Sequence, residues 1–166
     1  MKTIGINGVK LLKFFHLLFA VMWIGGAFCM VMLLISTQPT KSHEMYMYSQ
    51  ILKKIDDWLI VIGANGCVIT GIIYGICSKW GFFRHRWIIT KWLITIFMMA
   101  SGTFIMAPCV NGNVYATDEL NKYAMNNATF WHNISITEHW GVVQVVLLII
   151  TVIISIYKPQ IKRKKR

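Results

Sequence analysis

Two ionisable side chains stand inside apolar stretches of this sequence, where they could bind a metal or an anionic group. His16 lies in KFFHLLFAVMWIGG, residues 13–26, and Lys91 lies in RWIITKW, residues 86–92. Polar groups inside a membrane are costly, and they usually face a bundle interior, a cavity or a cofactor. Histidine is a common metal ligand, and lysine can supply a positive charge to an acidic group. Both residues are therefore candidates for chemistry, provided that the elements carrying them hold them together.

Four apolar runs provide those elements. The chain has 166 residues, of which 56% are hydrophobic and only 14% charged, unlike an ordinary soluble domain. Each run approaches or exceeds the roughly 18–20 residues that a helix needs to cross a bilayer, and backbone groups in lipid must be satisfied within their own segment. We expect an all-α integral membrane protein, a single four-helix bundle over residues 1–166. Its expected spans are Phe14–Ile35, Trp58–Cys77, Trp87–Ala107 and Trp140–Tyr157.

The positive charge gathers on one side of the expected bundle. The formal net charge is +11. Basic residues precede the first span, occupy the turn between the second and third spans, and form the tail 158–166. The positive-inside rule therefore predicts that both termini are cytoplasmic. We expect the tail to be attracted to anionic lipid, so the predicted partner is the bilayer and not a nucleic acid.

His16 and Lys91 are expected at the same depth. His16 lies about one turn beyond Lys13, and Lys91 about one turn beyond Trp87, on two helices that run in the same direction. At a rise of about 1.5 Å per residue, each lies roughly 5–6 Å inside the cytoplasmic boundary. The helix face of His16 also carries Trp23, with small residues beside aromatic ones, as expected where a flat ring fits between helices. Two simpler interpretations stay open: His16 bonded to a backbone carbonyl, and Lys91 extended to the headgroups.

Other polar residues near the spans have separate expected roles. His139 opens the fourth span at the opposite interface, about a bilayer thickness from His16, so it could ligate only a second haem. Otherwise it is a solvated interface residue. Asn65 and Gln144 are expected to hydrogen-bond between helices. His85, in the basic turn, is a reserve second ligand at the His16 end.

Glycine spacing and the outer connections complete the predicted architecture. Gly71 and Gly75 form a GxxxG motif in the second span, which predicts close approach of a neighbouring helix. The connections Ser36–Asp57 and Cys109–His139 are expected outside the membrane. The first could extend the second helix, and the second could hold one short helix.

Copper is the alternative metal. The chain has ten methionines, and its four cysteines show no CxxC spacing. Thioether and imidazole ligands suit Cu(I), although methionine is also an ordinary gap-filler in apolar packing. The methionines expected toward the outer side are Met30, Met32, Met45, Met47, Met106 and Met125.

One motif of the first expected helix resembles a known pattern. KxxHxxxxxxWxGG, read from Lys13 through His16 and Trp23 to Gly26, resembles the first helix of the CopD and HemJ-type membrane proteins. HemJ-type protoporphyrinogen oxidases are four-helix bundles that bind b-type haem, and a first-helix histidine pairs there with a lysine of a later helix. The resemblance therefore implies cofactor-binding roles for His16, Trp23 and Lys91. Most of the chain is also similar to an uncharacterised family of bacterial integral membrane proteins related to both groups, which implies the bacterial inner membrane. That similarity rests on TGIIYG, KWGFFRHRWIITKW, GTFIMAP and ISIYKP.

Three functions are consistent with these observations. The first is a b-type haem protein that moves electrons, as a cytochrome-like relay or an oxidoreductase. His16 would ligate its iron, His139 that of a second haem, and its partner would be a quinone, a porphyrinogen or another membrane redox protein. The second is copper handling of the CopD kind. The third is a cofactor-free accessory subunit of a membrane complex, in which the chain could also form oligomers. The phosphate-loop, nucleophile-elbow and HExxH motifs do not occur in the sequence.

Overall fold

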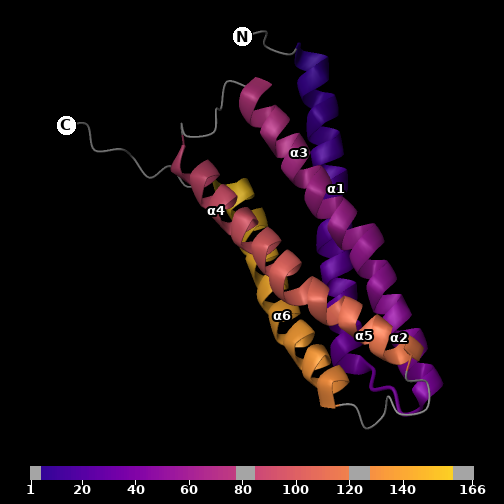
Figure 1. Ribbon diagram of the computed structural model, residues 1–166. Helices are drawn as coiled ribbons and strands as arrows, with labels where there is room; N and C mark the ends of the chain where they lie inside the picture. Colours follow the sequence, from indigo (N-terminus) through magenta and orange to yellow (C-terminus); the bar gives the residue numbers. More distant parts are fainter. Residues whose placement is uncertain (1–4, 78–84, 120–127, 159–166) are drawn as a thin grey trace.

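The computed structural model describes residues 5–77, 85–119 and 128–158 (Figure 1). Within these ranges the chain is helical and has no strand, so the all-α prediction is confirmed. Two short π-helical segments, η1 and η2, interrupt the α-helices without ending them. The elements are α1 (Ile6–Ser36), α2 (Ser42–Ile55), η1 (Asp56–Val61), α3 (Ile62–Cys77), α4 (Arg86–Ser101), η2 (Gly102–Met106), α5 (Ala107–Glu119) and α6 (Ala128–Tyr157).

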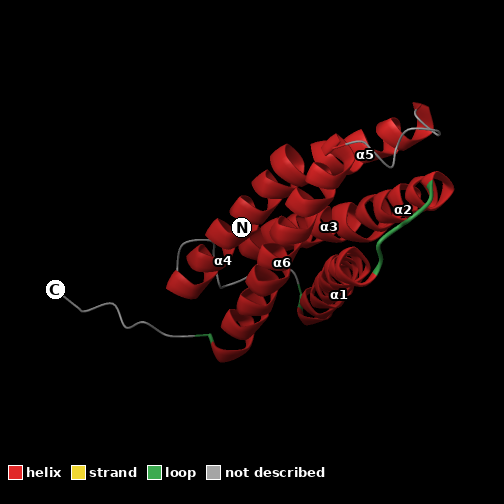
Figure 2. Ribbon diagram, turned by 90° about the horizontal axis from the view of Figure 1, so that it is seen from below, coloured by secondary structure: helices red, strands yellow, loops and turns green. Residues whose placement is uncertain are grey.

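Four continuous helical stretches are long and apolar enough to cross a membrane, as the hydropathy predicts. They are α1, α2 through α3, α4 through α5, and α6, with candidate spans Asn7–Ser36, Ser42–Cys77, Arg86–Thr117 and Ala128–Tyr157. Viewed from below, α1 packs beside α3 and α6 (Figure 2). α1 begins and α6 ends at the same end of the bundle. We call this the basic end, because Lys10, Lys13 and Lys158 lie there.

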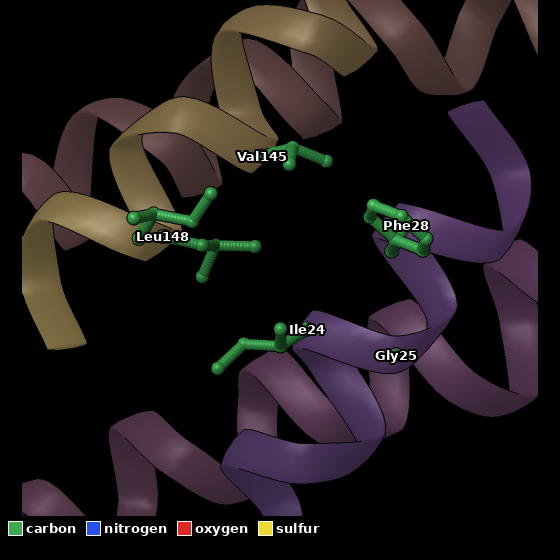
Figure 3. Close-up of a pocket in the computed structure, with 6 residues that line it drawn as sticks. Ile24, Gly25, Phe28, Val145 and Leu148 are labelled. Carbon is green, nitrogen blue, oxygen red and sulfur yellow. The ribbon is translucent and has the colours of Figure 1, made fainter. Parts of the chain in front are cut away.

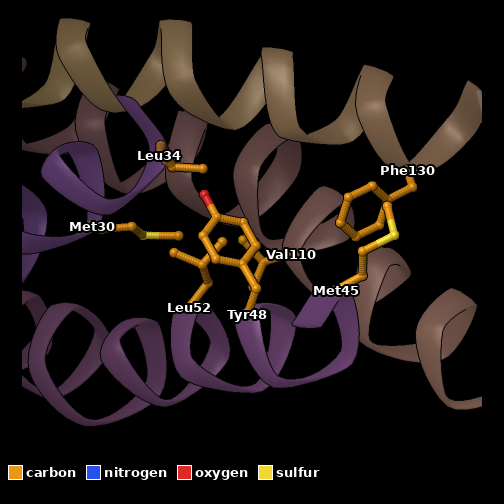
Figure 4. Packing of buried hydrophobic residues seen from close by; sticks show 7 residues of the cluster. All are labelled: Met30, Leu34, Met45, Tyr48, Leu52, Val110 and Phe130. Atoms are coloured by element: carbon orange, nitrogen blue, oxygen red, sulfur yellow. The ribbon is translucent and has the colours of Figure 1, made fainter. Parts of the chain in front are cut away.

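The helices extend well beyond the apolar runs of the sequence. The expected connection Ser36–Asp57 consists mostly of α2, and much of Cys109–His139 belongs to α5 and α6. The bundle has two apolar cores, the first of which surrounds Trp23 and Met98. The second accounts for this extension, because α2 packs on α1 and α5 through side chains spaced along one helix face (Figure 4). The buried residues of that core are Met30, Leu34, Met45, Tyr48, Leu52, Val110 and Phe130.

Glycines bring α1 and α3 into close contact. A Cβ added at Gly63 would lie 2.6 Å from the backbone nitrogen of Trp23, and one at Gly66 would overlap the Phe19 ring. At Gly71, the first glycine of the GxxxG motif, the nearest atom would be 3.8 Å away, an ordinary contact. The close approach therefore lies two turns earlier on α3 than the motif predicts, next to Trp23.

The two intramembrane amides behave differently. Gln144 on α6 donates from Nε2 to the backbone oxygen of Met98 at 3.3 Å, and Ser101 Oγ and Met106 Sδ lie at 3.4 and 3.3 Å. It therefore joins α6 to α4 and η2, as predicted. Asn65 donates to the Val61 carbonyl of its own helical stretch at 2.8 Å, because its side chain is exposed on the bundle surface. The prediction of an interhelical bond is wrong for Asn65.

Replacing Gln144 with leucine is expected to lower the free energy of unfolding by about 1 kcal/mol, since interhelical hydrogen bonds in membranes contribute about that much. The measurement is thermal or denaturant unfolding in one detergent. Val143→Leu is the matched control, because Val143 is the preceding residue and is exposed. Equal stability of the two variants would show that the Gln144 bonds contribute nothing.

Candidate functional site

His16 is fixed to α3 through its ring. Its Nδ1 lies 2.8 Å from the hydroxyl oxygen of Thr70. That hydroxyl has one hydrogen, which it donates at 2.6 Å to the Gly66 carbonyl, with the Cys67 carbonyl at 3.2 Å. The Thr70 oxygen must therefore accept a hydrogen from His16 Nδ1. The hydrogen-bond network assigns the proton to Nδ1 and leaves the lone pair on Nε2.

The backbone of His16 adds a further contact with α3. Cys67 donates from Sγ to the backbone oxygen of His16 at 3.7 Å. Ring and backbone together hold the half-buried His16 in one orientation.

Lys91 brings the other two spanning helices into the same site. Its Nζ donates to Ser155 Oγ on α6 at 2.7 Å, and Ser155 in turn donates to the Thr151 carbonyl at 2.7 Å. Trp92, the residue after Lys91, and the His16 ring both approach Gly71 of α3. Lys91 therefore lies on the part of α4 that approaches His16. We call His16, Thr70, Lys91 and Ser155 the His16 site, to which α1, α3, α4 and α6 each contribute one side chain.

A glycine separates the imidazole from an aromatic ring of α4. A Cβ added at Gly71 would lie 3.9 Å from His16 Cε1 and 3.8 Å from Trp92 Cζ2. The two rings thus approach a backbone position that carries no side chain. Neither Thr70 nor Gly71 was expected as a site residue. The signal for them was their place in TGIIYG, on the helix predicted to pack against His16.

Trp23 lies in a separate place, the wall of a cavity of about 260 Å³ inside the bundle. Trp23 is 5% exposed, and its Nε1 is buried without a hydrogen-bond partner in the described part of the chain. His16 does not line this cavity, so the structure separates the two residues that the sequence placed on one face. The bundle cavity, as we call it, is lined by Trp23, Ala27, Met30, Val31, Asp56, Ile60, Val61, Ala64, Asn65, Met98, Met99, Gly102, Thr103, Met106, Ala107, Gly141 and Gln144.

The methionines considered for copper have different environments. Met30 and Met106 line the bundle cavity, where Met98 and Met99 join them. Met45 packs in the second apolar core. Met32 and Met47 are exposed, and Met125 lies outside the described residues.

His139 does not meet His16. It is exposed on α6, about three turns beyond the start of the helix at Ala128, and its Nδ1 lies 2.6 Å from the Ser135 carbonyl of the same helix. His85 precedes α4 at the basic end and stacks on Trp87, with ring centroids 6.2 Å apart. In the part of the chain that the structure describes, no three His, Cys, Asp or Glu side chains are grouped so that they could hold a metal ion.

A second hollow lies between α1 and α6 (Figure 3). It measures about 280 Å³, and its lining residues Ile24, Gly25, Phe28, Val145, Leu148 and Ile149 are all apolar. Phe28 is 57% exposed, so the hollow opens on the outer surface of the bundle. This surface has the character of a contact with lipid chains and offers no group for chemistry.

Comparisons with protein-family models, with curated proteins and with solved structures found no match. The resemblance to CopD and HemJ-type proteins therefore stays a prediction from the motifs.

Proposed function

We propose that this protein binds one b-type haem within the membrane, with His16 Nε2 as an axial ligand to the iron, and that it transfers electrons. The observation that carries the proposal is the His16–Thr70 hydrogen bond, which holds the proton on Nδ1. Histidines that ligate metals commonly donate from the other ring nitrogen to such a partner, which fixes the tautomer and the ring orientation. The imidazole needs no rearrangement of its protons to bind iron.

The other side chains of the His16 site suit the acidic part of a haem. Lys91 is held between α4 and α6 by Ser155 and has further N–H donors for a propionate. Its positive charge would also oppose the extra positive charge of ferric iron and so favour the reduced state. The haem itself supplies the one-electron chemistry when bound. The protein's part is to ligate it, orient it and set its potential.

The bundle cavity does not suit a haem. No histidine lines it, so it offers no imidazole to the iron. We therefore place the haem at His16, near the basic end. With that end in the cytoplasm, as the positive-inside rule predicts, the cofactor lies toward the inner face of a bacterial membrane. A quinone, a porphyrinogen or another membrane redox protein is the proposed electron partner.

The test is a visible spectrum of the full-length protein, purified in detergent after growth with excess haem precursor. The reduced-minus-oxidised spectrum is expected to show one sharp b-type α-band, with one haem per chain. His139→Ala is the matched control and should leave both unchanged, because His139 is exposed and bonded within its own helix. A colourless protein would overturn the proposal in favour of copper or a cofactor-free subunit.

A further inference from the structure

The bundle cavity contains a hydrogen-bond donor that lacks an acceptor. Trp23 is 95% buried, and its Nε1 has no partner in the described part of the chain. Leaving a buried N–H unpaired is costly, so such groups usually point to a missing ligand or water. Trp23 also forms part of the cavity wall, so the residue with the unpaired N–H borders the space in which an acceptor could lie.

Both π-helical segments border the same cavity. η1 contributes Asp56, Ile60 and Val61, whereas η2 contributes Gly102, Thr103 and Met106. Single π-helical turns within α-helices occur frequently at functional sites, because they displace the side-chain register locally. Two such segments border one cavity although they belong to helices far apart in the sequence. This indicates that the cavity is a specific feature of the fold and not a packing defect.

The lining residues restrict the chemistry of an occupant. Most are apolar, and none is basic, so an anionic ligand is disfavoured. The methionine side chains among them are flexible and polarizable, and they adapt well to the face and edge of a ring. The donor of Trp23 calls for an acceptor such as a carbonyl oxygen. A volume of about 260 Å³ suits a single ring with small substituents.

The cavity also communicates with the surface that faces lipid. Val61, Asn65 and Thr103 line it and are themselves exposed on the bundle surface. A membrane-soluble molecule could therefore place its ring inside the bundle and leave an apolar tail in the bilayer. A neutral ring with carbonyl acceptors and an apolar tail is the chemistry of the membrane quinones.

We infer that the bundle cavity binds the ring of a quinone, with Trp23 Nε1–H donating to a ring carbonyl. The claim that the cavity binds a quinone depends on the cavity alone. The claim that this quinone is the electron partner rests on the proposed function, because the haem at His16 would exchange electrons with it. The two parts fail separately, since quinone binding can be measured on protein without haem.

The experiment uses the full-length protein in lipid nanodiscs and decylubiquinone as the probe. Saturable binding is expected for the natural sequence. Trp23→Phe keeps an aromatic ring but removes the N–H, so its affinity should fall about tenfold, the effect of losing roughly one hydrogen bond. Trp58→Phe is the matched control, because Trp58 is 68% exposed and does not line the cavity. Its affinity should equal that of the natural sequence.

Two further variants separate the cavity from the His16 site. Gly102→Leu places a side chain in the cavity wall, where the added Cβ meets its nearest atom, Gln144 Nε2, only at 3.5 Å, and it should abolish binding. His16→Ala should leave decylubiquinone affinity unchanged, because His16 lies outside the cavity. An indole N–H spectrum of the natural sequence gives an independent readout if Trp23→Phe fails to fold. The Trp23 signal should move downfield on saturation, and the signals of the other tryptophans should stay in place.

The inference is overturned if decylubiquinone does not bind saturably, or if Trp23→Phe binds it as tightly as the natural sequence. It is also overturned if the Trp23 signal does not move. Binding of Ag⁺ in place of the quinone would equally contradict it, since the four methionines of the cavity would then hold a soft metal ion.

Discussion

Replacing His16 with alanine is expected to abolish the b-type α-band, whereas replacing Thr70 with valine should weaken haem affinity about 10–100-fold and keep the band. Alanine removes the nitrogen that would ligate iron. Valine keeps the shape of threonine but removes the oxygen that accepts the Nδ1 proton at 2.8 Å. The ring can then turn and change tautomer, and losses of such supporting bonds cost metal sites about one to two orders of magnitude.

Haem titration of each purified variant, followed by its visible spectrum, measures both effects. Thr70→Ser restores the hydroxyl and should recover most of the affinity. His43→Ala is the matched control for His16→Ala and should bind haem normally, because His43 is exposed on α2. A retained α-band in His16→Ala would remove His16 from the site. An unaltered affinity in Thr70→Val would leave His16 as a possible ligand but remove the orienting bond from the proposal.

The sequence predicted those features that depend only on position along a helix axis, namely the number of spanning helices and the depth of a residue. Hydropathy predicts four spanning helices, and four helical stretches of that kind are found. Counting turns from Lys13 and Trp87 places His16 and Lys91 at one depth, and in the structure His16 and Trp92, the residue after Lys91, both approach Gly71. Rise per residue is a property of any α-helix, so depth can be predicted without knowing how the helices pack.

Hydropathy alone gives helices that are too short because it reports contact with lipid and not helicity, although the expected extension of the second helix through residues 43–57 is confirmed. The segment HEMYMYSQILKKIDD is polar on average, yet Met45, Tyr48 and Leu52 recur at helical spacing and are buried in the second apolar core. That periodic signal was present in the sequence. The sequence did not show which helix would cover this face of α2. The helix that does so is α5, which itself continues a span beyond its apolar run.

The bundle cavity could not be predicted from periodicity. A seven-residue spacing puts His16 and Trp23 on one face of α1, but their neighbours differ, so only Trp23 reaches the cavity. η1 and η2 change the side-chain register of their helices, and no residue type marks a π-helical turn. Asp56, predicted outside the membrane, is the first residue of η1 and lines the cavity.

Gly63→Ala is expected to destabilise the bundle by about 1–3 kcal/mol, the range for overpacking a tight interior. The added Cβ would lie 2.6 Å from the Trp23 nitrogen and 2.9 Å from the Phe19 carbonyl oxygen. Both are backbone atoms, so no side chain can rotate away, and α1 must move relative to α3. Gly71→Ala is the matched control on the same helix, because its Cβ would make only ordinary contacts at 3.8–3.9 Å. It should be neutral or slightly stabilising, since alanine is the better helix former.

Unfolding of the two variants in one detergent measures the difference, and equal stabilities would contradict the packing of α1 on α3 through Gly63. The same pair of variants separates stability from function. The shift forced by Gly63→Ala acts on the backbone of Trp23, so decylubiquinone binding should fall together with stability. Gly71→Ala places a methyl group between His16 and Trp92 and leaves the bundle cavity unchanged. It should therefore weaken haem binding and leave quinone binding and stability unchanged. Gly63→Ala should instead lower quinone binding and stability.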